Sequence, residues 1–311
     1  MASPTTLGLV KTGAGFSAAA DGTLSARIAT TSQVGVVKAG VTANIAADGT
    51  LADAVGFRNR LRNASFAINQ RGVSGTVTLA AGAYGHDGVK AGAAGAAYTF
   101  STSGIDTTIN NASGSIILPI EAGMIEGGVF VFSHAGTAQA RVWQGAGTTG
   151  SGAYASAPFT VTLTAGVQTN VEFSTGTILR PQLEPGSTAT VFERRPPNVE
   201  LAMCKRFYQA LVTGQMIAIA NSASTVLMTG GLPVAMRAIP NAALLTTSLA
   251  SSSYTLYSGG AWIGASSMAI TVPGTAAENY WLVISGFSGL TIGALVMGNG
   301  SAALMSFSAE I

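Results

Sequence analysis

Two segments near the beginning of the chain are close copies of each other. Leu7 to Ser25 reads LGLVKTGAGFSAAADGTLS, Val34 to Ala52 reads VGVVKAGVTANIAADGTLA, and ten of the nineteen aligned positions are identical. The Asp-Gly pairs at 21–22 and 48–49 are typical of tight turns between short strands, so each copy predicts a small β-hairpin or β-arc. Because a unit this short cannot bury a core of its own and only two copies are present, we expect other chains to supply the packing partners.

This requirement predicts an oligomeric stalk over residues 1–57, of the kind that a fibre contains. Alternating glycine and alanine would let neighbouring backbones approach closely in such a narrow bundle. The sizeable apolar side chains that we expect to line it are Leu7, Val10, Phe16, Leu24, Val34, Val37 and Leu51.

The chain is unusually poor in charge for its apolar content. Charged residues make up 9% of 311 residues and hydrophobic residues 48%, whereas a soluble domain carries roughly 25% charge. The net charge of +2 and the scattered basic residues give no stripe for nucleic acid. One cysteine, Cys204, rules out an intrachain disulfide, and the N-terminal residues lack the pattern of a signal peptide.

Beyond the repeats, the sequence predicts an all-β organisation around one helix. Residues 58–197 contain eight or nine short strand-like runs separated by glycine-rich turns, which favours a β-sandwich. Asn198, after two prolines, is a good helix N-cap, and Leu201, Cys204, Tyr208 and Leu211 recur at helical spacing, so we expect a bridging helix over 198–212. Residues 213–311 return to strand-like runs and predict a distal β domain.

One uncharged segment, Tyr280 to Gly298, is long enough to be tested as a membrane span. Two Ser-Gly pairs interrupt it, its β-branched and aromatic residues favour strands, and no Lys or Arg follows Arg237. We therefore expect a strand, a Ser-Gly turn and a second strand, and no membrane span.

Several tracts resemble bacteriophage and prophage fibre proteins of the head-fibre and tail-fibre type. The opening tract is RNASFAINQRG at 62–72, QLEPGSTATVFERRP at 182–196 resembles a closing strand, and ELAMCKRFY at 200–208 resembles the helix after it. LPVAMRAIP at 232–240 resembles the entry to a distal domain, and the GVVKAG repeat is similar to head-fibre repeats. Together these matches span the chain from residue 7 to its last residues.

The resemblance implies an intertwined homotrimeric virion fibre, assembled in the host cytoplasm, with a jelly-roll domain of the carbohydrate-binding-module type. It further implies that the N-terminus is held by another virion structural protein and that the chain attaches the virion to the host cell surface. The alternatives are a purely architectural capsid or tail decoration protein and a polysaccharide-depolymerising tailspike.

The sequence contains few residues that could carry out catalysis. The two histidines, His86 and His134, are too few for a multi-histidine metal site, and Asp106, Glu121 and Glu126 are carboxylates whose proximity in sequence is best explained by chance. His86-Asp87 could supply two metal ligands, but an aspartate capping its own turn is the favoured interpretation. We expect no catalytic residue, no metal and no cofactor.

Sugar binding requires an exposed aromatic ring beside amide or hydroxyl groups. Two clusters fit that description, and in both the alternative is that the tryptophan packs a core or a subunit contact. The candidate glycan-binding residues are Trp143, Gln144 and Tyr154 in the first cluster and Tyr254, Tyr257 and Trp262 in the second.

Overall fold

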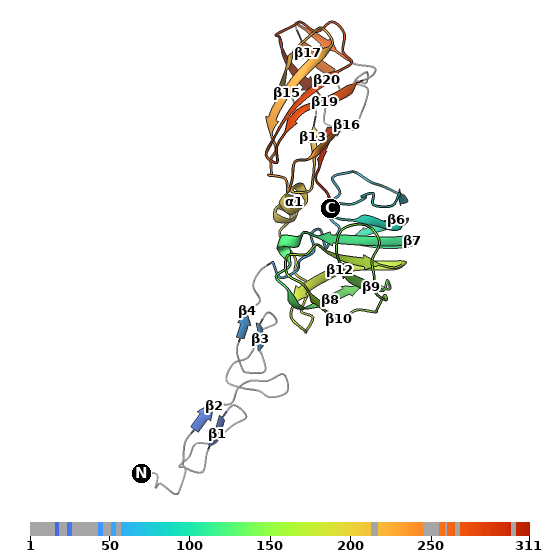
Figure 1. Cartoon of the computed structure of the whole chain (residues 1–311), viewed down its shortest axis with the longest axis vertical. Helices are drawn as coiled ribbons and strands as arrows, with labels where there is room; N and C mark the ends of the chain where they lie inside the picture. The colour runs from blue at the N-terminus through green and yellow to red at the C-terminus, as the bar shows by residue number, and fades with distance from the viewer. Residues whose placement is uncertain are drawn as a thin grey trace. The chain divides into compact units, whose positions relative to one another are not determined.

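The computed structural model describes residues 16–18, 24–26, 43–45, 51–53, 57–212, 217–244, 255–258, 260–264, 268–299 and 303–311 (Figure 1). Within these ranges the regular structure is almost entirely antiparallel β-sheet, so the all-β class predicted from the sequence is confirmed. The chain divides into two units, one made of Met1–Arg58 with Thr188–Glu193 and the other of Asn59–Ser187 with Arg194–Ile311.

Each N-terminal copy contains the hairpin that its sequence predicts. The first is β1 (Phe16–Ala18) with β2 (Leu24–Ala26), and the second is β3 (Ala43–Ile45) with β4 (Leu51–Asp53). Phe16 pairs with Ala26 in the first, and Ala43 pairs with Asp53, each 27 residues further along, in the second. The repeat in sequence is therefore a repeat in backbone structure.

Of the residues expected to line the stalk, Phe16, Leu24 and Leu51 lie in these strands. Leu7, Val10, Val34 and Val37 lie outside the described residues. Their packing against other chains stays a prediction.

Residues 77–185 form eight antiparallel strands in one connected sheet, in the region where the sequence predicts a β-sandwich, and we call this region the sandwich. The order is β10-β8-β12-β7-β11-β9, and β5 and β6 extend it beside β7. The strands are β5 (Val77–Leu79), β6 (Lys90–Ser103), β7 (Asp106–Ile120), β8 (Gly128–Ala135), β9 (Ala140–Gln144), β10 (Phe159–Leu163), β11 (Thr169–Phe173) and β12 (Gly176–Pro185), with the 3-10 helix η1 (Ala122–Met124) after β7.

Aromatic side chains from β8 and β11, which are not neighbours in the sheet order, meet in the sandwich core. Phe130 and Phe132 alternate along β8 and are fully buried, and Phe132 meets Phe173 of β11 edge-on with ring centroids 5.7 Å apart. Ile109 and Ile116 of β7 are also fully buried. These strands bury more than the one face that the period-2 pattern predicts, because Val131 between the two phenylalanines is also buried and all five residues of β11 are buried.

The bridging helix is shorter than the predicted span of 198–212. Helix α1 covers Pro197–Lys205, begins with Pro197 at its first position, and has no side-chain cap, so Asn198 lies inside the helix. Proline is favoured at the first helical position because its missing N–H would have no partner there. Tyr208–Val212 form strand β13 instead, because their backbone pairs with β22 (Ala303–Ser308).

The distal domain contains two antiparallel sheets that enclose one core. In the smaller sheet, β22 lies between β13 and β16 (Asn241–Leu244). The larger sheet has seven strands among the described residues, in the order β18-β17-β21-β14-β15-β20-β19. These are β14 (Ile217–Ala220), β15 (Thr225–Gly231), β17 (Thr255–Ser258), β18 (Ala261–Ile263), β19 (Ala269–Thr275), β20 (Asn279–Ser285) and β21 (Leu295–Asn299).

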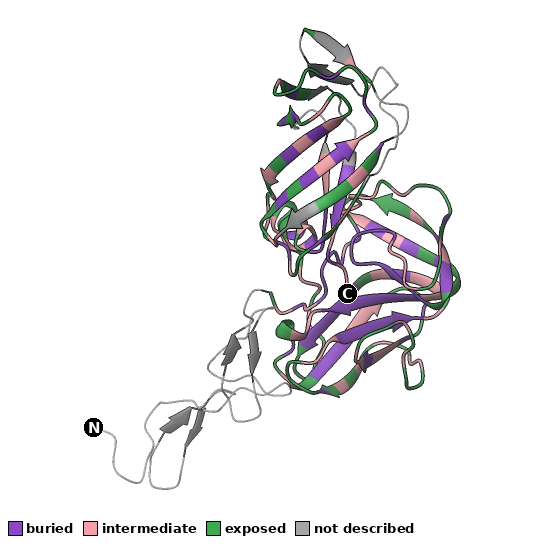
Figure 2. Ribbon diagram, turned by 45° about the horizontal axis from the view of Figure 1, so that its top comes forward, coloured by how far each residue is buried: buried purple, intermediate pink, exposed green. Residues whose placement is uncertain are grey.

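Buried and exposed residues alternate along the strands of the larger sheet (Figure 2). Val226, Leu282 and Ile284 point into the core with Met305 and Phe307 of the smaller sheet. The uncharged segment expected to form two strands does so, as β20 and β21, but the connection is a longer loop over 286–294. No helix among the described residues is long and apolar enough to cross a bilayer.

Close packing between β6 and β7 gives a direct test of this fold. A Cβ added to Gly114, whose φ is +71°, would lie 2.0 Å from the carbonyl oxygen of Gly95, whereas one added to Gly104, with φ +62°, meets nothing within 4 Å. Left-handed strain costs roughly 1–2 kcal/mol at either position, and forced repacking adds about 1–3 kcal/mol. Gly114→Ala should therefore lower the free energy of unfolding clearly more than Gly104→Ala in chemical denaturation. Equal losses would contradict the register between β6 and β7.

Candidate functional site

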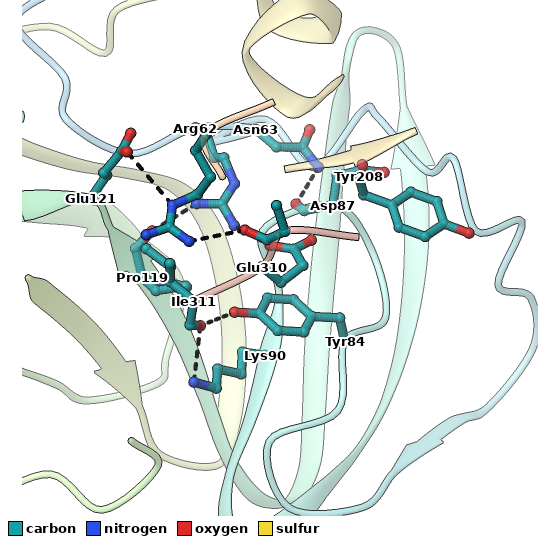
Figure 3. Close-up of polar contacts among 12 residues, drawn as sticks. Arg62, Asn63, Tyr84, Asp87, Lys90, Pro119, Glu121, Tyr208, Glu310 and Ile311 are labelled. Carbon is teal, nitrogen blue, oxygen red and sulfur yellow. Dashed lines mark hydrogen bonds and ion pairs between the residues drawn. The ribbon is translucent and has the colours of Figure 1, made fainter. Parts of the chain in front are cut away.

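The last described residues of the distal domain reach a buried ionic cluster on the sandwich (Figure 3). Glu310 accepts hydrogen bonds from Arg62 at 2.7 Å and from Arg71 at 3.0 Å. The Glu310 and Arg62 side chains are almost fully buried. Arg62 also donates to the carbonyl oxygen of Pro119 and stacks 3.7 Å from the centre of the Phe207 ring. Because a buried carboxylate is costly unless it is paired, the two arginines hold the end of β22 in place.

Tyr84 and Lys90 fix the neighbouring residue, Ile311. The Tyr84 hydroxyl and the Lys90 ammonium both donate to the backbone oxygen of Ile311, the latter at 2.9 Å. Burial, with the nearby Glu310 carboxylate, raises the pKa of Tyr84 and keeps the phenol protonated. This cluster fastens the residues that follow β22 to the sandwich, and each of its side chains contacts another part of the chain.

His86 and Asp87, considered as metal ligands from the sequence, are both occupied within the fold. The Tyr98 hydroxyl accepts from the backbone N–H of His86 and lies 3.0 Å from Nδ1 of its ring. Asp87 accepts from the backbone and side chain of Gln70. Among the described residues, no group of three His, Cys, Asp or Glu side chains is placed to hold a metal ion.

Trp143 and Gln144 of the first predicted glycan cluster lie on β9 and Tyr154 lies in the loop before β10, and the tryptophan is buried. Trp143 is 6% exposed and its indole N–H donates to Glu172 at 2.9 Å. Arg141 donates to the same carboxylate oxygen at 3.0 Å, and the Tyr154 hydroxyl donates to the other at 2.9 Å. The Trp143 ring is therefore closed to stacking on a sugar, and the alternative that it packs a core describes this structure.

Gln144 is also engaged by its own chain. Its side-chain amide donates to the carbonyl oxygen of Thr164 and accepts from the backbone N–H of Thr164, both at 2.9 Å. Tyr154 is half-buried with Arg141 4.5 Å from its ring centre. The structure brings the first cluster together, as the sequence predicts, but uses its polar groups to support the sandwich.

The second predicted cluster falls at the edge of the seven-stranded sheet. Tyr257 of β17 is the cross-strand partner of Trp262 of β18, and Tyr257 also pairs with Met297 of β21. Tyr254 lies outside the described residues. The backbone thus places two of the three aromatic positions opposite each other at a sheet edge.

An apolar strand that contains Tyr280-Trp281 favours a core position for both rings, but the structure buries only Tyr280. Tyr280 and Leu282 point into the core, while Trp281 between them is 49% exposed on the outward face of β20. The period-2 alternation of the strand was the signal that could have identified it. Four more large apolar side chains on this outward face are about half exposed: Ile217, Ile219, Leu295 and Met297.

The carboxylates considered for sugar hydrolysis each have arginine partners. Glu121 pairs with Arg206 and Glu126 with Arg60. Hydrogen bonds from Arg180 and Arg194 lower the pKa of Asp106. A general acid needs the opposite shift, since it must hold its proton near neutral pH. Each of these three carboxylates is therefore paired with arginine.

Comparisons with protein-family models, with curated protein sequences and with solved structures found no match to this chain.

The burial of His86 predicts a pH-dependent stability. Desolvation lowers the pKa of His86 to about 4, from its usual value of 6.5. As the pH falls from about 6.5 to about 4, the unfolded chain binds a proton that the folded chain excludes, so stability falls over that window. His86→Asn should be less stable near pH 7 and should flatten this part of the profile, measured by denaturant unfolding at successive pH values. A slope that the substitution leaves unchanged would contradict the assignment.

The buried carboxylate of Glu172 should matter far more than a surface one. Glu172→Gln removes the charge that Arg141 and Trp143 satisfy, and we expect a loss of about 2–3 kcal/mol in the free energy of unfolding. Glu126→Gln, which removes the charge of an exposed ion pair with Arg60, should cost less than about 1 kcal/mol. Chemical denaturation measures both. Comparable losses would show that Glu172 does not organise this cluster.

Proposed function

We propose that the chain is a structural virion fibre protein, a homotrimer whose N-terminal repeats form the stalk and whose β domains mediate attachment to the host cell surface. The observation that carries the proposal is the repeated hairpin, in which β1–β2 and β3–β4 have the same register at an interval of 27 residues. Repeated small β units are how extended, multichain fibres are built.

The hairpins need partners for a physical reason. Each has two strands of three residues, and an isolated two-stranded hairpin is at best marginally stable in water. Equivalent hairpins of other copies can cover its apolar residues. The virion end of such a stalk would be held by another structural protein of the particle.

Attachment by glycan binding is the activity that the distal aromatic positions support best. Tyr257 and Trp262 are cross-strand partners on the edge hairpin β17–β18, and Tyr254 lies one residue before β17. Sugars offer flat C–H faces that stack on such rings. Three tethered copies would raise the effective concentration of each further binding event, which offsets a weak single site. The arginine-paired carboxylates support adhesion without catalysis.

The test compares Trp262, a position at the edge of the distal sheet, with Trp143, which is buried in the sandwich. The purified full chain should bind one member of a panel of bacterial surface polysaccharides, and Trp262→Ala should weaken that binding at least tenfold. Trp143→Phe, which alters a buried ring, should leave the affinity within about twofold. Surface plasmon resonance on immobilised polysaccharide measures both.

Two results would replace the proposal. A chain that binds no polysaccharide and does not compete with virus adsorption favours the architectural decoration protein. Release of reducing sugar from the bound polysaccharide favours the depolymerising tailspike.

A further inference from the structure

The outward face of the seven-stranded distal sheet is an apolar surface. Ile217 and Ile219 of β14 pair with Met297 and Leu295 of β21. On the other side of β14, Ile219 pairs with Leu227 of β15. The exposed fractions of the four residues on β14 and β21 are 63% for Ile217, 51% for Ile219, 57% for Leu295 and 48% for Met297.

The same surface continues across β15 to β20. Leu227 pairs with Val283, and both are half-buried, while Thr229 pairs with the exposed Trp281. Directly paired residues on one face lie about 4.5–5.5 Å apart, so these side chains touch in two rows across four neighbouring strands. We call this surface, made of Ile217, Ile219, Leu227, Trp281, Val283, Leu295 and Met297, the distal apolar face.

An antiparallel sheet with one solvated face shows apolar residues inward and polar residues outward. Here the inward residues of β14 and β21, Ala218, Ala220 and Val296, are buried in the core, and the outward residues are apolar as well. Apolar residues on both sides of a strand are typical of a sheet that is covered on both faces. In a single copy of the chain, the outward face of this sheet is open to water.

We infer that the distal apolar face packs against the distal domains of other copies of this chain, an inference that rests on the proposed homotrimeric fibre and names its contact surface. The copies would turn their larger sheets toward a shared symmetry axis and bury the face between them. Contact is centred on β21, β14, β15 and β20, and it borders the edge hairpin β17–β18, where Tyr257 is the cross-strand partner of Met297.

The chemistry of the face favours an identical copy over other occupants. None of the seven strands contains Asp, Glu, Lys or Arg, so the face has no charge with which to select a charged partner. Binding to a lipid surface is strengthened by Lys and Arg beside the apolar face, and the only basic residue after Arg206 is Arg237. A sugar needs converging polar groups, and beside the seven apolar residues the two rows contain one hydroxyl, that of Thr229. An uncharged apolar surface is complementary to itself, and closed symmetry keeps it from further aggregation.

The face can supply part of such an interface. Its four strands, about 4.8 Å apart and each about five residues of ~3.4 Å, give a flat area of roughly 300 Å². A stable interface buries about 800 Å² per partner. The face therefore supplies less than half of an interface, and the repeats of the stalk are available to supply the remainder.

Methionine oxidation tests the inference on the unmodified full chain. Met297 lies on the face and is 48% exposed, whereas Met124 lies in η1 of the sandwich and is 36% exposed. With hydrogen peroxide, sulfoxide at each methionine is quantified by peptide mass spectrometry. If copies cover the face, Met297 should react at least tenfold more slowly than Met124. Oxidation of Met297 as fast as that of Met124 in the oligomer would overturn the inference.

A matched pair of double variants gives a second measurement. Ile217→Thr with Ile219→Thr removes apolar area from the face, and threonine keeps the β-branched shape that a strand favours. Ile105→Thr with Ile239→Thr makes the same change at two loop positions that are each 70% exposed. By sedimentation equilibrium, the face variant should raise the concentration of half-dissociation at least tenfold, and the control should leave it within twofold.

The outcomes separate this inference from the proposed fibre. A wild-type chain that is monomeric at every concentration rejects both. A wild-type oligomer with a reactive Met297 and an unaffected face variant keeps the fibre and rejects the distal contact. A Met297 that becomes protected only when phosphatidylcholine vesicles or a bacterial polysaccharide is added assigns the face to lipid or glycan, and also rejects the contact between copies.

Discussion

The whole chain depends on one physical constraint: its apolar side chains have to be covered. It has few charged residues that could keep an exposed surface solvated. At 9% charged residues, a solvated face has to rely on Ser, Thr, Asn and backbone groups. The sandwich meets this constraint internally, with Phe130, Phe132 and Phe173 in its core. The distal sheet meets it on one face only, since Ile217, Ile219 and Leu295 are left exposed on the other. The same constraint applies to the N-terminal hairpins, because strands of three residues are too short to bury a core of their own.

The few charged groups are concentrated where the fold has to be fastened. Arg62 and Arg71 hold Glu310 at the end of the distal domain, and Arg141 with Trp143 holds Glu172 inside the sandwich. Such groups are strongly coupled to folding because a buried charge without its partner is costly. The consequence for function is that polar residues that looked available for a ligand, Gln144 and Tyr154 among them, already support backbone or carboxylate groups. What is left exposed in the described part of the distal sheet is uncharged, and it includes Ile217, Trp281 and Leu295.

The sequence was informative where a local pattern determines a local structure. The Asp-Gly turns predicted the hairpins. The alternation of Phe130 with Phe132 correctly predicted a strand but not its burial, because Val131 between them is buried as well. Local patterns failed where long-range pairing decides: Tyr208 and Leu211 have helical spacing but lie in β13, because β22, almost a hundred residues later, pairs with them. The burial of Trp143 depends on Glu172 of another strand, and the exposure of Trp281 depends on which face of β20 meets the core. Neither the Arg62–Glu310 pair, 248 residues apart in sequence, nor the distal apolar face could be seen before the strands were paired.

The central claim is that the chain completes its packing only with further copies of itself, and the mass of the purified full chain in solution tests this most directly. Sedimentation equilibrium or native mass spectrometry at micromolar concentration should give three times the 31.1 kDa of one chain, with the same mass after tenfold dilution. A single species of 31.1 kDa that stays soluble and folded at the same concentrations would contradict the account.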